Sequence, residues 1–253
     1  MLSYVICFLN RKKEMTPMNL DTILNDLKQI SDPKMIHAME KRYPNMKVLG
    51  IPLGTLRPMA KKMGIDHELG ISLYHTHCVE AMFLGCMVMD PKQLAIQNLE
   101  KLAIAAQSTS IMDQGLSKLI DESTHFEDIL KSWYQSPDEH LRYAGYVLFS
   151  SYFRSYPLDE MDTLLGKHIL ETIKAQLSEE SLPIQNAMNN AVVMAGLHVP
   201  ALVDLAIEVA IHIGYVLPRV RKNQCNIQSA YEYIIRYSNQ PNYSRIAKLK
   251  IKT

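Results

Sequence analysis

The sequence has 253 residues, of which 47% are hydrophobic, and its 27 Lys and Arg residues nearly balance its 26 Asp and Glu residues. That length can bury a substantial core, and the balanced charge excludes a global field that would attract a polyanion, so any nucleic-acid-binding face has to be local. The four cysteines show no CxxC pair or disulfide framework, which favours a reducing, cytoplasmic location; they are Cys7, Cys78, Cys86 and Cys225.

The first residues do not have the pattern of a signal peptide or a membrane anchor. The apolar run Tyr4–Leu9 is followed, not preceded, by Arg11, Lys12 and Lys13, and it is far shorter than the roughly 20 apolar residues of a membrane span. We therefore expect no association with a membrane. Because a helix-like pattern begins only near Met15 or Met18, residues 1–17 are interpreted as a disordered extension or a start-site artefact.

Further along the chain, Leu, Ile, Met and Ala recur at spacings of three and four, with few β-branched alternations, which predicts helices nearly throughout. Asp32 before Pro33 and Ser136 before Pro137 are typical of helix starts. The predicted helices are Leu20–Ile30, Pro33–Arg42, Thr55–Met63, Asp66–His75, Cys78–Met89, Pro91–Ala105, Ile111–Ile120, Phe126–Tyr134, Pro137–Arg154, Leu158–Leu177, Pro183–Gly196, Pro200–Ile213 and Ile227–Tyr237.

A weak internal repeat accompanies these helices. A small residue precedes a proline, expected to start a helix, by the same thirteen positions in three places: Cys78 to Pro91, Ala144 to Pro157, and Ala187 to Pro200. The last two copies start 43 residues apart, within the ~40–47 residue period of HEAT-type repeats. The fold prediction is therefore all-α, a single α-solenoid of HEAT-like helical repeats over 18–240, followed by a basic tail at 241–253. An irregular helical bundle is the alternative.

The segment "VLGIPLGTLRPMAKKMG", Val48–Gly64, resembles the "G-V-x-x-P-x-L-R-x-L-A-K" segment of AlkD-like DNA alkylation repair proteins. Similarity continues through "HCVEAMFLGCMVMD", "STSIMD" and "LKSWYQSPDEHLRYAG", and it covers roughly 19–237. The resemblance implies HEAT-like repeats whose concave side grips duplex DNA. In active members it also implies excision of cationic N3- or N7-alkylated purines.

This excision chemistry requires few groups. An alkylated purine is already positively charged and leaves easily, so a carboxylate has mainly to stabilise the developing oxocarbenium ion of the sugar. No metal or nicotinamide cofactor is required, and we expect no cofactor. Active family members add two tryptophans that pack against the lesion and an arginine that binds phosphate.

Matched residue by residue, the resemblance places the catalytic carboxylate on Asp113. The tryptophan four residues earlier is replaced by Thr109, the second tryptophan by Asn190, and the phosphate-binding arginine by Tyr143, with Arg142 adjacent. Because losing one positioned group commonly costs ~10²–10³ in rate, this pattern predicts a weakened or inactive enzyme. The structural alternative for Asp113 is an ordinary aspartate in the first turn of a helix, where the dipole favours it.

Other polar residues yield two further predictions. Clusters of basic residues could contact successive phosphates of DNA if they line one face of the protein. The alternative is that they are solvated surface residues. The clusters include Arg57 and Lys61, then Arg219 and Arg221, and the tail "RIAKLKIK". His75 and His77, near Glu80, lack the spacing of a metal site, so no metal is expected.

Taken together, these patterns predict a DNA alkylation repair family protein that binds duplex DNA, which could be damaged, with weak or no base excision. One alternative is an active N3- or N7-alkylpurine DNA glycosylase that uses Asp113. A further alternative is a protein-interaction scaffold of HEAT repeats, which the near-neutral charge permits.

Overall fold

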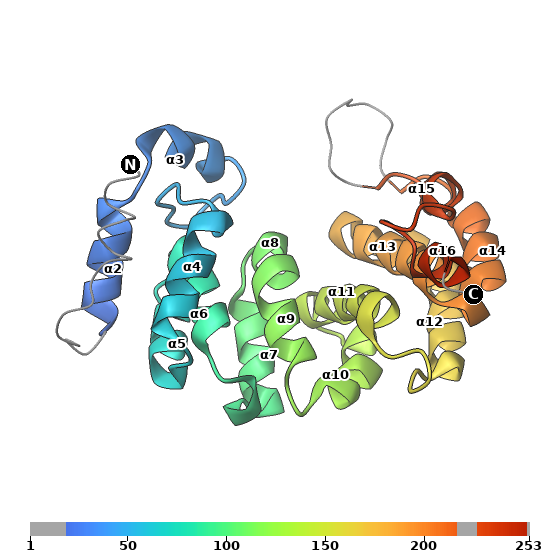
Figure 1. Cartoon of the computed structure of the whole chain (residues 1–253), viewed down its shortest axis with the longest axis horizontal. Helices are drawn as coiled ribbons and strands as arrows, with labels where there is room; N and C mark the ends of the chain where they lie inside the picture. Colours follow the sequence, from blue (N-terminus) through green and yellow to red (C-terminus); the bar gives the residue numbers. More distant parts are fainter. Residues whose placement is uncertain (1–18, 217–226, 252–253) are drawn as a thin grey trace. The chain divides into compact units, whose positions relative to one another are not determined.

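The computed structural model describes residues 19–216 and 227–251, and helices joined by short connections make up both ranges (Figure 1). Within those ranges there is no β-strand, although isolated β-bridges join Lys47 to Cys78 and Tyr215 to Ser229. The prediction of an all-α chain is therefore confirmed. The chain forms two compact units, Met1–Phe126 and Glu127–Thr253. The extension expected at 1–17 lies outside the described residues.

Several helices of the first unit start where short polar side chains cap them. Asn19 accepts a hydrogen bond from the Thr22 amide, and Asp66 accepts one from the Leu69 amide; Asp32 caps a helix whose first residue is Pro33, as predicted. In chain order the elements are α2 (Leu20–Gln29), α3 (Pro33–Glu40), α4 (Leu53–Met63), α5 (His67–Tyr74), α6 (Val79–Val88), η1 (Pro91–Gln93), α7 (Ile96–Ala105), α8 (Thr109–Ile111), η2 (Met112–Leu116) and α9 (Ser117–Asp121).

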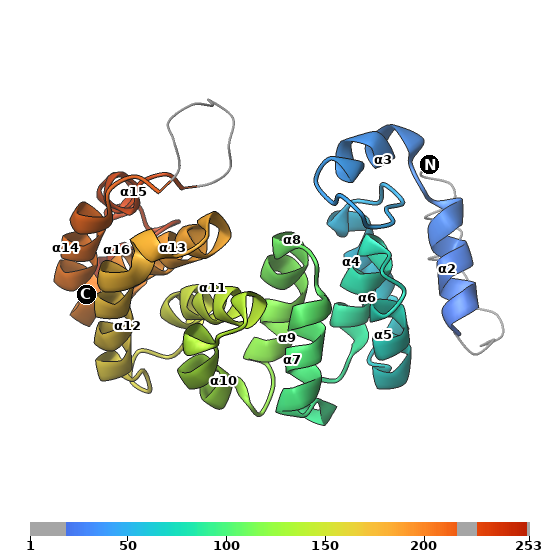
Figure 2. The same cartoon turned by 180° about the vertical axis from the view of Figure 1, so that it is seen from behind.

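Helix α6 is the centre of the first unit because it is buried on all sides. Its residues from Val79 to Cys86 are buried without exception, as expected of a helix that is apolar around its whole circumference. Helices α4 and α5 pack against it, and Figure 2 shows the three side by side. Two glycines permit the close approach of α5, since a Cβ on Gly85 would lie only 2.6 Å from the carbonyl oxygen of Gly70.

The carboxylate of Glu80 is fully buried in α6 and holds the segment before α4. Both of its oxygens accept from the Leu49 amide at 3.0 Å, and Oε1 also accepts from the Ile51 amide at 3.1 Å. These bonds flank Gly50, which has a φ of +76°. A Cβ there would lie 2.4 Å from the Asp32 carbonyl oxygen, so only glycine fits.

The second unit is organised around α13 in the same way. Most residues of this long helix are buried, and α11, α14, α15 and α16 pack on it. Trp133 is buried, as expected for a core residue. The elements are α10 (Phe126–Ser132), η3 (Trp133–Gln135), α11 (Glu139–Ser155), α12 (Thr163–Gln176), η4 (Leu177–Glu179), α13 (Leu182–His198), η5 (Pro200–Leu202), α14 (Val203–Ile213), α15 (Ala230–Tyr237) and α16 (Arg245–Lys250).

Several predicted boundaries were wrong, and local capping explains them. The helix predicted from Leu158 begins at Thr163, because the Asp162 carboxylate accepts from the Leu164 and Leu165 amides at 3.0 Å. Pro157 therefore starts no helix, which weakens the proposed repeat at that copy. Likewise Asp138, not Ser136, caps α11.

The continuous helix predicted over Pro91–Ala105 is interrupted. Asp90 caps the short η1, and the chain is extended at Leu94, whose side chain is 1% exposed. Because the extended backbone at Leu94 places this side chain in the core, η1 ends before α7 begins. Two other predicted α-helices contain 3-10 turns at one end. The helix predicted over Phe126–Tyr134 has one from Trp133, and the helix predicted over Pro200–Ile213 begins with one at Pro200.

No single helix in the described ranges is both long and apolar enough to cross a membrane. The pair Leu182–His198 and Pro200–Ile213 meets the length and composition criteria together but is bent by 119° at the break.

Replacing Glu80 by Ala should destabilise the chain, because the buried amides of Leu49 and Ile51 lose their acceptor. We expect a loss of about 2–4 kcal/mol in the free energy of unfolding, measured by urea denaturation. Glu171→Ala, at an exposed position in α12, is the control and should change stability by less than about 0.5 kcal/mol. Equal effects of the two substitutions would contradict the role given to Glu80.

Candidate nucleic-acid interface

Asp113 lies in the first turn of a π-helical segment. Ser108 caps the preceding turn by accepting from the Ser110 amide at 3.3 Å, and α8 begins at Thr109. Asp113 follows in η2, the π-helical segment, and its side chain and that of Gln114 are exposed. The interpretation of Asp113 as an ordinary aspartate in the first turn of a helix therefore stays a prediction beside the catalytic one. A π-helical turn changes where side chains point, and such turns are frequent at functional sites.

The π segment packs closely on α6 through Gly115. A Cβ at this position would lie 3.1 Å from the Cys86 sulfur, closer than almost any real contact of that kind, so a larger residue would push η2 away from α6. The sequence therefore places a glycine where the bulged helix meets the buried one. That contact fixes the exposed pair Asp113 and Gln114 relative to the core of the unit.

An arginine that the sequence analysis missed also lies near Asp113. Arg42 follows α3, and its Nε and Nη2 atoms donate to the Ser110 hydroxyl at 3.1 and 2.8 Å. Ser110 is adjacent to Thr109 and three residues before Asp113. No local pattern around Arg42 predicts this contact, because the two residues are 68 positions apart.

Two of the predicted basic residues line a hollow beside the π segment, which we call the Arg57 hollow. Its volume is about 550 Å³, and it is lined by Arg57, Ala60, Lys61, Gly64, Ile65, Cys86, Met87, Met89, Pro91, Gln114, Gly115, Lys118, Leu119 and Glu122. Arg57 and Lys61 lie four residues apart on α4 and therefore face the same side. The structure thus places both cations in the hollow that the two residues after Asp113 also line.

Comparison with known proteins identifies the family. The sequence model described as DNA alkylation repair enzyme matches residues 23–234. The chain belongs to the DNA alkylation repair enzyme family. The uncharacterized proteins Lin0241 of Listeria innocua and Lmo0209 of Listeria monocytogenes are each 22% identical to it, over 89% and 88% of this chain and 100% and 99% of their own lengths.

A solved structure has a fold similar to that of this chain. It has a TM-score of 0.81 and 21% identity, and the match covers 90% of this chain and 98% of that one. That structure is described as a new family of proteins related to the HEAT-like repeat DNA glycosylases with affinity for branched DNA structures. At this identity the match establishes the fold, and it confirms the prediction of HEAT-like repeats.

Arg142, in the second unit, is engaged within the protein. Its Nε and Nη2 atoms donate to the Glu180 carboxylate at 2.7 and 3.1 Å, and Nη1 donates to the Ser136 carbonyl oxygen at 2.8 Å. The hydrogen bond to Glu180 also raises the pKa of Arg142. With both arms of the guanidinium satisfied, this arginine links the start of α11 to the segment before α13, and a phosphate would have to displace Glu180.

Of the other residues predicted to bind DNA, Tyr143 and Asn190 are half-buried, and Arg219 and Arg221 are not described by the structure. Tyr143 is half-buried on α11, and Asn190 is half-buried on α13 with a buried Oδ1 atom that makes no hydrogen bond within the described residues. Its neighbour Asn189 is fully buried, donating to the Ile227 carbonyl oxygen and accepting from the Ala230 amide. Arg219 and Arg221 lie outside the described residues.

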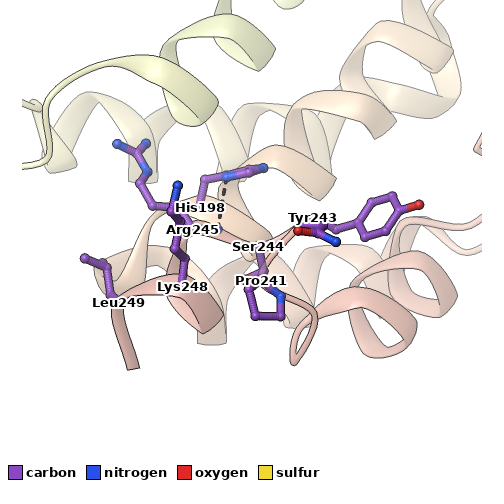
Figure 3. A pocket seen from close by; sticks show the side chains of 8 residues that line it. His198, Pro241, Tyr243, Ser244, Arg245, Lys248 and Leu249 are labelled. Carbon is purple, nitrogen blue, oxygen red and sulfur yellow. Dashed lines mark hydrogen bonds between the residues drawn. The ribbon is translucent and has the colours of Figure 1, made fainter. Parts of the chain in front are cut away.

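Part of the basic tail is packed helix. Arg245 begins α16 and donates to the carbonyl oxygens of Phe153 and Tyr156 at 2.6 and 2.8 Å, while the Ser244 hydroxyl donates to Leu197. Figure 3 shows the hollow of about 370 Å³ beside them, with the His198 ring next to Ser244. Arg245 therefore holds the C-terminal helix in place and is not a solvated cation.

The surroundings of the histidine pair His75 and His77 bear on the prediction that the chain holds no metal. No group of three or more His, Cys, Asp or Glu side chains in the described ranges could hold a metal ion. Glu80, which lies close to His75 and His77 in sequence, is occupied with the Leu49 and Ile51 amides.

Replacing Arg142 by Ala should destabilise the second unit, because the Glu180 carboxylate, 13% exposed, loses its partner. We expect about 1–3 kcal/mol less free energy of unfolding, with Arg142→Lys in between because an ammonium lacks the two-armed geometry. Arg154→Ala on the same helix is the control. Should Arg142→Ala leave stability unchanged and lower DNA affinity, Arg142 would be the phosphate ligand that the resemblance implies.

His198 should make stability depend on pH. Burial, and then Arg245 and Arg154, lower its pKa from 6.5 to about 4. Between those two values the unfolded chain binds more protons than the folded chain, so stability falls as pH drops from about 6.5 towards 4. The urea midpoint of wild type should therefore fall more between pH 7 and pH 5 than that of His198→Gln. Parallel curves for the two proteins would exclude this role.

Proposed function

We propose that this chain is a DNA-binding member of its family that binds duplex DNA, including damaged or branched duplex, and excises bases weakly or not at all. The observation that carries the proposal is the Arg57 hollow, where three cations gather next to the segment that bears Asp113. Family membership supports DNA as the partner. The similar structure described as having affinity for branched DNA supports it further.

The charges of the hollow favour an anionic ligand. Arg57 and Lys61 are exposed and form no ion pair within the described residues, whereas Lys118 lies 3.8 Å from Glu122. The lining therefore has three cationic side chains and one carboxylate, an excess of +2. On a chain of net charge +1, such a local excess supports contact with a phosphate backbone, which supplies most of non-specific affinity.

Two residues at positions that the family resemblance assigns to the site support weak excision. Thr109 is exposed and small, so it supplies no aromatic wall against the sugar of a lesion. Arg142 is held by Glu180. A carboxylate alone can stabilise an oxocarbenium ion, but without groups that position the sugar the rate enhancement falls by several orders of magnitude.

An active alkylpurine glycosylase is the second candidate, and one observation favours it. Asp113 is exposed on a π-helical segment, an arrangement that costs helix stability and that functional sites often retain. Under this hypothesis two side chains would position the substrate in place of the missing tryptophans. They are Arg42, which donates to Ser110, and Gln114, which follows Asp113 in the chain.

The proposal includes the cytoplasmic location that the cysteines predict. Cys78 and Cys86 are both buried free thiols, and burial raises the pKa of each, which suits a reducing compartment.

Fluorescence anisotropy of the full chain with a labelled four-way junction and a labelled plain duplex tests DNA binding. We expect affinity for both that falls steeply as salt rises, and Asp113→Asn should retain it. Absence of binding to either DNA at low salt would reject the proposal and leave the protein-interaction scaffold.

Base excision is tested separately with a duplex that carries 7-methylguanine. Chromatography should detect little or no free base over the uncatalysed rate. Release of base that Asp113→Asn abolishes, and that a matched Glu122→Gln substitution leaves intact, would instead establish the glycosylase.

A further inference from the structure

The Arg57 hollow has two kinds of lining, and a phosphate contact alone does not explain both. Its cations come from two elements, Arg57 and Lys61 from α4 and Lys118 from α9. The lining also includes apolar side chains, among them Met87 at the end of α6 and Ile65 after α4, which we call the apolar floor. A site for a phosphodiester needs only cations and donors at a surface, so the apolar floor calls for a second, uncharged part of the ligand.

Helix electrostatics account for two of the three cations. Lys61 is in the last turn of α4 and Lys118 is in the last turn of α9, where a cation stabilises the negative end of the helix dipole whatever its function. Lys118 also lies 3.8 Å from the Glu122 carboxylate. Arg57 is in the second turn of α4, far from the end of that helix, and forms no ion pair within the described residues. An anionic ligand would account for its place in the same hollow.

The floor has the properties of a surface for a flat aromatic ring. Ile65 is 66% exposed, so its side chain is accessible to a ligand. Met87 is half-buried, and thioethers adapt to planar groups. The volume of about 550 Å³ lies within the range of roughly 300–1,000 Å³ that is typical of sites for small organic ligands.

We propose that the Arg57 hollow holds one unpaired nucleotide of bound DNA. Its phosphate contacts Arg57, Lys61 and Lys118, and its base lies on Ile65 and Met87. The nucleotide has to be unpaired because a base inside a duplex is stacked and cannot reach a pocket. Gln114, which lines the hollow next to Asp113, offers an amide to the edge of that base.

This inference rests on the proposed function, since it requires that the chain bind DNA. It adds a reason for a preference among DNA structures: flaps, junctions and damaged sites present unpaired nucleotides, and a continuous duplex does not. The cations of the hollow would contribute affinity for both kinds of DNA, and its apolar side chains would add affinity only for DNA with an unpaired nucleotide.

The test compares two labelled DNAs of equal duplex length, one with a five-nucleotide single-stranded flap, by fluorescence anisotropy over a range of salt. Arg57→Ala/Lys61→Ala should lower affinity for flap DNA about tenfold more than for duplex, and should reduce the salt slope by roughly 1 to 2. Ile65→Ser should lower the preference for the flap without changing the slope, because it removes apolar area and no charge.

A matched control carries the same loss of charge elsewhere in the first unit. Lys28→Ala/Lys101→Ala changes two exposed lysines that do not line the hollow, and it should leave the preference for the flap as in wild type. Circular dichroism and thermal unfolding confirm that each variant is folded before binding is compared.

The outcomes separate the two proposals. Wild type that binds neither DNA rejects the proposed function, and this inference with it. Wild type that binds DNA while Arg57→Ala/Lys61→Ala loses affinity for flap and duplex equally, or not at all, overturns the nucleotide site alone. Competition by free thymidine monophosphate at concentrations equal to that of the DNA would mean that the hollow takes a free nucleotide, and would also overturn it.

Discussion

The structure depends on one mostly buried helix in each unit. Helix α6 has no exposed residue, and α13 buries ten of its 17 residues, so each requires neighbours over most of its circumference. Around α6 the neighbours include α4, α5 and η2, and around α13 they include α11, α14, α15 and α16. The elements that present Asp113 and the Arg57 hollow are therefore held in place by covering α6.

The buried charge in α6 adds specificity to that packing. Apolar contacts alone would let the irregular segment between α3 and α4 slide along α6, because they have no direction. Glu80 prevents this by accepting hydrogen bonds from two amides on either side of Gly50. Since α4 begins three residues after Gly50, the same carboxylate fixes where Arg57 and Lys61 emerge. A structural acid thus positions two cations of the Arg57 hollow.

Most of the positively charged residues predicted to bind DNA divide into two chemical roles. Arg142 donates to Glu180 and to a backbone carbonyl oxygen, and the two terminal nitrogens of Arg245 donate to backbone carbonyl oxygens, so both residues stabilise the second unit. Arg57 and Lys61 have no such partners in the described chain and remain available to a ligand. This division explains how a chain of nearly balanced charge can still present a local basic site, and why counting Lys and Arg residues does not locate it.

The sequence by itself determined the all-α class, the Asp32 cap and the burial of Trp133, because the spacing of apolar residues and local hydrogen bonding decide these. By resemblance to the family it also predicts Asp113 as the catalytic carboxylate. It failed at Pro91 and Leu158, where Leu94 turns into the core and Asp162 caps later than expected. Only the tertiary structure decided that Arg42 donates to Ser110 and that Arg142 pairs with Glu180. It alone also decided that Arg57, Lys61 and Lys118 line the same hollow. Those contacts join residues far apart in the chain, and no local pattern records them.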